Sequence, residues 1–258
     1  MANPIGWCTK TWNPITGCTP VSPACDHCYA RRMSHRLKGR FGYPADEPFR
    51  VTVHPERLEE PEHWRKPQRV FVGSMTDVFH PDIPAGFVRS LFALMDSYRQ
   101  HTFLLLTKRP QYALEFAQGW GMQPWPRTIH LGVTAENQEM ADERIPILLS
   151  IPAAVHWVSV EPCLEPIGLS SIPCQDGRTI DALGGSIFGG NRDKYGAPYY
   201  EIKNHAKLDW VVGGVESGPG KRACDPAWIK SLYEQCKDYG VPFFDKREKD
   251  PLAREFPR

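Results

Sequence analysis

The chain has almost no net charge and no long apolar run. Its 31 lysines and arginines nearly balance its 30 aspartates and glutamates, which leaves a formal net charge of +1. No overall electrostatic field therefore points to a nucleic-acid or membrane partner, although this balance leaves room for a local basic patch. No stretch approaches the roughly 18 apolar residues of a membrane-spanning helix, so we expect no association with a membrane.

The N-terminus also lacks the marks of a secretory leader. Residues 1–7 hold neither a charged segment nor an apolar core. No internal repeat and no low-complexity tract is visible in the sequence. With 258 residues, of which 41% are hydrophobic, the chain is long enough to bury a sizeable core. We expect a single cytoplasmic domain over residues 1–258.

The cysteines are unevenly distributed. There are eight of them, and an even number would suit disulfides, but a cytoplasmic chain of this length favours reduced thiols. Three fall within eleven residues, in the spacing C-x6-C-x2-C, at Cys18, Cys25 and Cys28. A metal ion or cluster explains this trio better than disulfides do.

Three ligands are informative because a closed site needs four. A structural zinc site takes four protein ligands, and so does a fully protein-ligated iron–sulfur cluster. Thiolates suit both zinc and iron–sulfur, and the spacing alone leaves both alternatives open. Zinc would need a fourth ligand, for which Cys8 is feasible, whereas His27 lies awkwardly inside the C-x2-C turn. The iron–sulfur alternative would leave one position free for chemistry.

Six short runs rich in β-branched and aromatic residues recur, and helical patterns separate most of them. The runs cover residues 70–73, 102–107, 129–134, 155–160, 208–214 and 241–244. Helices are predicted over residues 84–98, 110–117, 137–149 and 225–239. Apolar strands that alternate with helices are typical of a parallel sheet buried on both faces. We therefore predict an α/β fold, a partial (β/α) barrel of about six parallel strands.

Nearly every predicted strand ends in a small or polar group. In parallel α/β folds, the carboxyl ends of the strands form the face that carries the active site. We expect the side chains at these ends to form a polar ring that contains Asp77, Lys108, Glu136, Glu161 and Glu216.

One segment interrupts the alternation of strands and helices. Residues 164–207 are rich in Gly, Pro, Tyr and polar residues, and this length is too great for an ordinary loop in a compact domain. We predict an inserted loop region at the strand-end face. It would serve either as a lid or substrate contact, or as a variable surface loop.

Several motifs resemble those of a known superfamily. Cys25 and Cys28, followed by Tyr29 and Ala30 and then by a parallel α/β repeat, resemble the radical S-adenosylmethionine superfamily. More closely, the chain is similar to a phage-associated family named for its three-cysteine motif, over most of residues 5–246. The segments that carry this resemblance are residues 11–18, 25–30, 71–80, 106–110, 132–137, 159–162 and 213–218.

The resemblance implies a cofactor and a reaction. In the superfamily, three cysteines hold a [4Fe–4S] cluster, and S-adenosylmethionine binds the fourth iron. Reductive cleavage then releases a 5′-deoxyadenosyl radical, which abstracts a hydrogen from the substrate. By this resemblance Cys18, Cys25 and Cys28 hold the cluster in a TIM-type barrel, and an external electron donor of the flavodoxin or ferredoxin type is required. The first gap, usually three residues, is six here, but a longer loop still lets the sulfurs converge.

The resemblance also implies which strand ends contact S-adenosylmethionine. Ser74, Thr76 and Asp77 would lie near its amino group, and Lys108 near its carboxylate. The remaining contacts would be Thr134 and Glu136 at the ribose, Glu161 at ligand or substrate, and the segment with Gly213, Gly214 and Glu216 alongside. A structural alternative pairs Lys108 with Glu136 or Glu161. The glycine segment could equally be a tight turn before a helix that Asp225 caps.

A run of basic residues directly follows the cysteines. Arg31, Arg32, His35, Arg36, Lys38 and Arg40 are expected on a helix. Such a run is either a solvated face or a contact for nucleic acid. The strand motifs are also distantly similar to spore photoproduct lyase, a DNA-repair enzyme, which implies nucleic acid or a nucleobase derivative as substrate. The alternative to an enzyme is a zinc-stabilised module that binds nucleic acid without catalysis.

Overall fold

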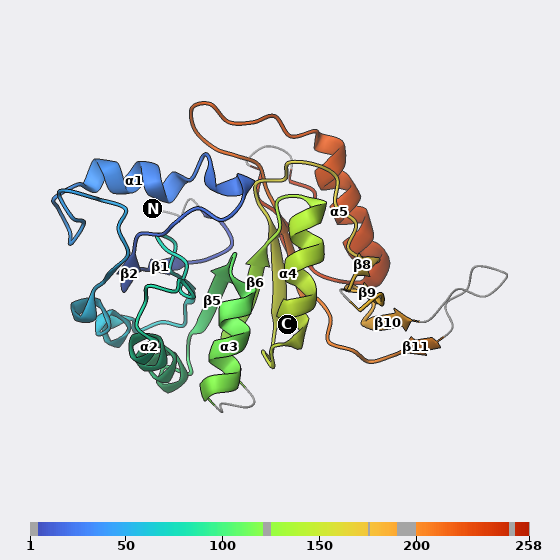
Figure 1. Ribbon diagram of the computed structural model, residues 1–258, viewed down its shortest axis with the longest axis horizontal. Helices are drawn as coiled ribbons and strands as arrows, with labels where there is room; N and C mark the ends of the chain where they lie inside the picture. Colours follow the sequence, from blue (N-terminus) through green and yellow to red (C-terminus); the bar gives the residue numbers. More distant parts are fainter. Residues whose placement is uncertain (1–4, 121–124, 175, 190–199, 248–250, 258) are drawn as a thin grey trace. The chain divides into compact units, whose positions relative to one another are not determined.

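The computed structural model describes residues 5–120, 125–174, 176–189, 200–247 and 251–257 (Figure 1). The chain forms two compact units. Unit 1 comprises Met1–Gly132 and Pro152–Ala154, and unit 2 comprises Val133–Ile151 and Val155–Arg258. The prediction of one domain over residues 1–258 stays a prediction.

Parallel strands form the centre of unit 1. Strand β4 (Arg69–Val72) lies between β1 (Lys10–Trp12) and β5 (Thr102–Thr107), and both pairings are parallel. The apolar residues of β4 and β5 are buried, with Val70 and Leu105 at 0% exposure. The sequence predicts β4 and β5 because strands buried on both faces are almost continuously apolar.

Two helices follow these strands in unit 1. Helix α2 (Ala85–Ser97) buries Val88, Leu91, Phe92 and Met95, which lie on one helical face at the expected spacing. Helix α3 (Pro110–Trp120) begins directly after β5. Both confirm the helices predicted over residues 84–98 and 110–117.

The cysteine-containing segment of unit 1 lies between two short strands. Strands β2 (Ile15–Thr16) and β3 (Thr52–Val53) pair in antiparallel fashion. Between them runs α1 (Tyr29–Leu37), which confirms the expected helix as far as Arg36, whereas Lys38 and Arg40 lie beyond its end. Three short 3-10 helices complete this region: η1 (Pro23–Cys25), η2 (Pro55–Arg57) and η3 (Glu60–His63).

Unit 2 repeats the parallel arrangement. Strand β12 (Trp210–Gly213) pairs in parallel with β7 (His156–Val160) on one side and β13 (Phe243–Asp245) on the other. Helices α4 (Gln138–Ser150) and α5 (Pro226–Tyr239) confirm the two predicted helices. No helix within the described residues is long and apolar enough to cross a membrane.

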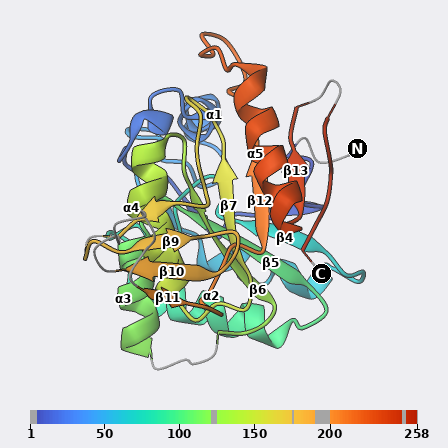
Figure 2. The ribbon, with the colours of Figure 1, turned by 90° about the vertical axis from the view of Figure 1, so that its right-hand side faces the viewer.

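The segment predicted as an inserted loop region contains a small sheet of its own. Within residues 164–207, the antiparallel order is β11-β10-β9-β8, and Figure 2 shows β9, β10 and β11 side by side. The strands are β8 (Ile172–Pro173), β9 (Thr179–Asp181), β10 (Ser186–Gly189) and β11 (Tyr200–Ile202). Residues 175 and 190–199 of this predicted insertion lie outside the described residues.

The strand order confirms the predicted fold class. It runs β1-β4-β5-β6-β7-β12-β13, with β6 at Ile129–Thr134, and strands alternate with helices in an α/β architecture of the partial (β/α) barrel type. The sequence predicts six of these seven strands. It misses β1, because Lys10, Thr11 and Trp12 form no apolar run.

His130 on β6 makes the stability of the protein sensitive to acid. Burial lowers the pKa of His130 to about 4 from 6.5, and its Nδ1 atom has no hydrogen-bond partner among the described residues. Between these two pH values the unfolded chain binds more protons than the folded chain does, so the free energy of unfolding decreases as the pH falls.

Replacing His130 with leucine should therefore reduce the acid sensitivity. We expect the loss of unfolding free energy between pH 7.5 and pH 5 to shrink by on the order of 2 kcal/mol. Urea titrations at both pH values would measure this. The exposed His63→Leu variant is the control; equal pH dependence in His130→Leu and the original protein would contradict the assignment.

Candidate functional site

The cysteine loop, residues 17–28, is fixed at its start to the segment after β4. The Gly17 N–H donates to the Met75 carbonyl oxygen at 3.0 Å, and Thr76 Oγ1 donates to the Gly17 carbonyl oxygen at 2.6 Å. The Cys18 N–H donates to the Phe49 carbonyl oxygen at 3.2 Å. These bonds set the backbone position of the first cysteine.

Gly17 is required at this anchor for two reasons. Its φ angle is +87°, and a Cβ atom built there would lie 2.1 Å from the Arg50 carbonyl oxygen. Because backbone at this distance cannot yield locally, we expect Gly17→Ala to lower the free energy of unfolding by about 2–4 kcal/mol. Denaturant titration would measure the loss. Gly119→Ala in α3, where a Cβ meets nothing within 4 Å, should not destabilise the protein.

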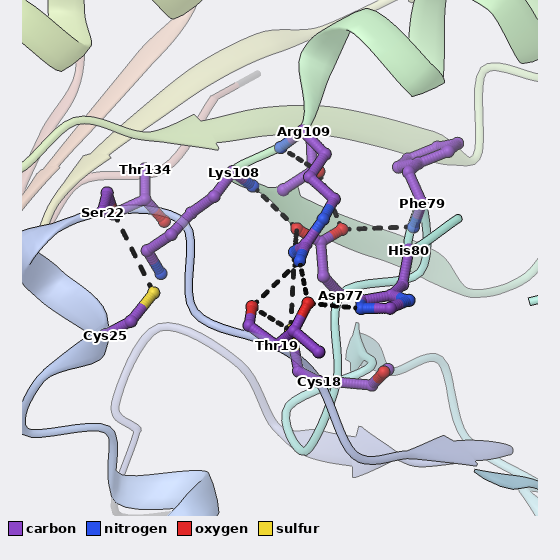
Figure 3. A network of polar contacts seen from close by, with 12 residues as sticks. Cys18, Thr19, Ser22, Cys25, Asp77, Phe79, His80, Lys108, Arg109 and Thr134 are labelled. Atoms are coloured by element: carbon purple, nitrogen blue, oxygen red, sulfur yellow. Dashed lines mark hydrogen bonds and ion pairs between the residues drawn. The ribbon is translucent and has the colours of Figure 1, made fainter. Parts of the chain in front are cut away.

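A buried carboxylate lies beside this loop (Figure 3). Asp77 follows β4 and is 5% exposed. Its carboxylate oxygens accept hydrogen bonds from Thr107 Oγ1 at 2.8 Å, from the Lys108 N–H at 2.9 Å and from the Phe79 N–H at 3.1 Å. Arg109 completes the set, with its Nη1 atom 3.4 Å from Asp77 Oδ2. The carboxylate is therefore fully engaged by unit 1 itself.

Arg109 connects this carboxylate to the cysteine loop. Its Nη2 atom donates to the carbonyl oxygen and to Oγ1 of Thr19, both at 2.9 Å, and its Nη1 atom donates to Cys18 Sγ at 3.5 Å. Burial raises the pKa of Cys18, and the Asp77 carboxylate adds to this increase, whereas Arg109 opposes it. Arg109 is thus the cation positioned to favour the thiolate of Cys18.

His80 supports the same loop from the segment after β4. Its Nε2 atom lies 2.8 Å from Thr19 Oγ1, and its Nδ1 atom accepts from the Asp82 N–H. The proton of the neutral ring therefore lies on Nε2, which donates to Thr19. Burial, followed by the Arg109 cation, holds the pKa of His80 below its usual range. The neutral ring is the form that this arrangement requires.

The other two cysteines of the loop are less constrained. Cys25 Sγ lies 4.0 Å from Ser22 Oγ, and Cys28 packs against the small cluster of Ala30, Tyr43 and Met75. Both are half-buried, and like Cys18 they form no disulfide.

The three thiols suit an iron–sulfur cluster by their chemistry, because soft sulfur donors from one loop can reach one centre. In the described part of the chain, no three His, Cys, Asp or Glu side chains are grouped closely enough to hold a metal ion. Binding a cluster would therefore require the loop to bring Cys25 and Cys28 toward Cys18. In such a movement Gly17 and Cys18 would keep their hydrogen bonds, and Cys25 and Cys28 would change position.

The residues predicted near the amino group of S-adenosylmethionine all follow β4 in unit 1. Ser74 Oγ donates to Asn13 Oδ1 at 3.1 Å, whereas Thr76 and Asp77 hold the cysteine loop and Arg109. The Lys108 side chain points toward the cysteine loop in Figure 3, and only its backbone N–H contacts Asp77. Among the predicted contacts in unit 1, Lys108 therefore has a charged side chain that does not pair with the Asp77 carboxylate.

The predicted residues of unit 2 lie at or just after strand ends, and their carboxylates are paired. Glu136 Oε2 lies 3.1 Å from Arg144 Nη1, and both side chains are buried. Glu161 Oε1 lies 2.5 Å from Lys246 Nζ, and Glu216 pairs with Arg222. The structural alternative that paired Lys108 with Glu136 or Glu161 is wrong in its cation, because these two glutamates pair with Arg144 and Lys246.

Thr134 and the two glycines have packing roles in unit 2. The Thr134 carbonyl oxygen accepts from Arg144 at 2.8 Å. A Cβ atom at Gly213 would lie 2.8 Å from the Phe243 ring, and one at Gly214 would lie 3.1 Å from Glu161 Cγ. Their assignments to S-adenosylmethionine, with those of Glu136, Glu161 and Glu216, stay predictions. Asp225 caps α5 by accepting from the Ala227 N–H, as the structural alternative expects.

Sequence reasoning missed the cationic partners of the predicted carboxylates. Arg109 directly follows Lys108 in the sequence, but the rule that strand ends carry the site was applied to Lys108 alone. The Asp245–Arg247 ion pair after β13 obeys the same rule. A search for cations near every strand end would have found these two arginines, but their partners depend on the fold.

Comparison with known proteins matches the chain to a family model. A family model described as "Protein of unknown function (DUF5131)" matches residues 2–250. No significant match was found among curated proteins or among solved structures.

Proposed function

We propose that this chain, which belongs to the DUF5131 family of proteins of unknown function, is an iron–sulfur enzyme of the radical S-adenosylmethionine type. Its substrate would be nucleic acid or a nucleobase derivative. The observation that supports this best is the set of three free thiols on one loop, which is anchored after a strand of a parallel sheet. Three thiolates leave one coordination position for a ligand.

Cys18, Cys25 and Cys28 are the residues that would hold a [4Fe–4S] cluster. When bound, it supplies the electron for reductive cleavage of the sulfonium of S-adenosylmethionine to a 5′-deoxyadenosyl radical. An external one-electron donor of the flavodoxin or ferredoxin type would have to provide that electron.

Arg109 is the residue beside Cys18 that favours the thiolate form that metal binding needs, whereas burial and the Asp77 carboxylate raise the pKa of this thiol. Arg109 lies 3.5 Å from the sulfur and lowers the pKa of Cys18 against the effect of burial. Asp77 holds the guanidinium in place, and because its oxygens are engaged within unit 1, we assign it this positioning role rather than ligand binding. Thr19 and His80 fix the loop on the other side of Arg109.

Lys108 is the residue of unit 1 that we assign to the carboxylate of S-adenosylmethionine. Its side chain points toward the cysteine loop (Figure 3), and an ammonium is a suitable partner for an anionic ligand group. Ser74, in the segment after β4, is assigned to the amino group. This half of the ligand would then lie next to the three thiols.

The test is anaerobic purification followed by iron, sulfide and zinc analysis, with EPR of the reduced protein with and without S-adenosylmethionine. We expect about four irons per chain and a spectrum that the ligand perturbs. One zinc per chain without an EPR signal would overturn the proposal in favour of the zinc-stabilised module. That module would need Cys8, which is only 3% exposed, or His27 as its fourth ligand, and loss of the metal in Cys8→Ala would identify Cys8.

A further inference from the structure

The turn after α1 has an unusual backbone for its sequence. The Tyr43 N–H donates to the Arg40 carbonyl oxygen at 3.0 Å, and the Gly39 N–H donates to the Tyr43 carbonyl oxygen at 3.0 Å. The φ angles of Phe41 and Gly42 are +53° and +79°. Positive φ at both central residues is characteristic of a type I′ turn, in which Asn-Gly and Gly-Gly are the preferred pairs.

The Phe41 side chain is mostly exposed at this strained position, so burial stabilises it little. A bulky side chain at positive φ costs free energy, and Phe41 is 72% exposed. Its ring therefore recovers little hydrophobic stabilisation in the folded chain. Folding stability does not account for phenylalanine at the tip of this turn, whereas binding through the ring would.

Three cations precede Phe41 in the chain. Arg36, Lys38 and Arg40 are exposed, and Arg40 donates to the Arg36 carbonyl oxygen at 2.5 Å. No carboxylate of the described residues forms an ion pair with any of these three cations. The next acidic residue along the chain, Asp46, pairs with Arg50 instead. The turn therefore presents positive charge with an aromatic ring at its centre.

The apolar side of α1 is already used within unit 1. Ala30 and Ser34 are buried, and Leu37 packs against the cluster that contains Tyr43 and Met75. A helix that binds a membrane surface needs a broad apolar face directed at the lipid. Beside its cations, α1 exposes Tyr29 at 48% and Met33 at 41%, and the turn exposes Phe41 at 72%, which makes Phe41 the most exposed apolar side chain of this surface.

We propose that Arg36, Lys38, Arg40 and Phe41 form a binding surface for single-stranded nucleic acid. The cations would contact phosphates, and one base would stack on the exposed ring, which is the combination that sequence-tolerant single-strand binding uses. This surface would bind the substrate of the proposed function, and its role in catalysis rests on that function. Binding itself can be measured independently of the cysteines.

The experiment measures fluorescence anisotropy of labelled oligonucleotides of roughly 12 nucleotides, single-stranded and duplex, with the full-length protein at several salt concentrations. Phe41→Asn suits the turn better than phenylalanine, so we expect an unchanged or higher melting temperature. Its affinity for the single strand should fall roughly 5- to 150-fold, the value of one stacked base. Tyr112→Ala removes another exposed aromatic side chain, on α3, and should change neither quantity.

Charge variants test the phosphate contacts separately. The slope of log affinity against log salt concentration is negative, and Lys38→Ala and Arg40→Ala should each make it less steep by about 0.7. Cys25→Ser should bind as the original protein does, so loss of S-adenosylmethionine cleavage with retained binding would count only against the proposed function. Undiminished binding by Phe41→Asn, or binding to vesicles with anionic lipid but to no oligonucleotide, would overturn the surface.

Discussion

Replacing Cys25 with alanine should abolish both iron binding and the cleavage of S-adenosylmethionine, with the fold intact. Two thiolates cannot hold the cluster that three would hold, so we expect activity to fall below detection. Cys25 is half-buried and carries no disulfide, and its Sγ atom makes only a distant 4.0 Å contact with Ser22. Iron analysis and detection of 5′-deoxyadenosine would measure the losses, and circular dichroism would check the fold.

Cys174→Ala is the matched control for this prediction. Cys174 is also free and half-buried, but it lies in unit 2 and outside the cysteine loop. We expect it to keep full iron content and full cleavage, and we expect Cys18→Ala and Cys28→Ala to behave as Cys25→Ala does. A Cys25→Ala variant that retained its iron would show that the cysteine loop does not hold the proposed cluster.

Replacing Asp77 with alanine should be the most destabilising single change near the site. The substitution removes the acceptor of hydrogen bonds from Thr107, Lys108 and Phe79 and leaves the guanidinium of Arg109 buried without its counter-charge. Breaking a buried ion pair on one side costs about 3–5 kcal/mol. Urea titration of the purified protein would measure the loss in free energy of unfolding.

Asp82→Ala provides the comparison for this loss. The Asp82 side chain is 69% exposed and its carboxylate lies 3.8 Å from His80 Nδ1. An exposed carboxylate at this distance contributes little, so we expect a change within about 0.5 kcal/mol. Equal losses of unfolding free energy in Asp77→Ala and Asp82→Ala would show that the Asp77 carboxylate does not hold residues 107–109 as described.

The strands and helices were largely predictable because burial imposes simple patterns on them. The strand over residues 102–107 and that over 129–134 have the predicted limits, since their apolar runs coincide with the buried part of the sheet. Strand β1 was not predictable from its own residues. Its pairing with β4 depends on the fold, and three residues are too few for a periodic signal.

The site was predictable only in part, for a related reason. The rule that strand ends carry polar groups identified Asp77, Glu161 and Glu216, because this rule depends on local sequence. The partners of these carboxylates depend on contacts across the fold, such as that between Glu161 and Lys246, which are 85 positions apart. Neither charge nor spacing in the sequence distinguishes Arg109 from its neighbour Lys108 in this respect.

The small sheet within residues 164–207 was missed for another reason. Its described strands are two to four residues long, and β11 is fully exposed. Strands this short have too few residues for an apolar run or an alternation to be recognised, although β9 and β10 each bury two residues. The abundance of glycine and proline in this segment therefore predicted a loop.

The contacts of Arg109 also impose an order of events on a chain that is still being synthesised. Thr19 precedes Arg109 by 90 positions, so at roughly 5–20 residues per second the loop leaves the ribosome about 5–18 s before its cation does. Throughout that interval Thr19 has no guanidinium to hold it, and Cys18 has no neighbouring positive charge. If the loop holds the proposed cluster, the cation beside Cys18 is therefore in place only after translation has passed Arg109.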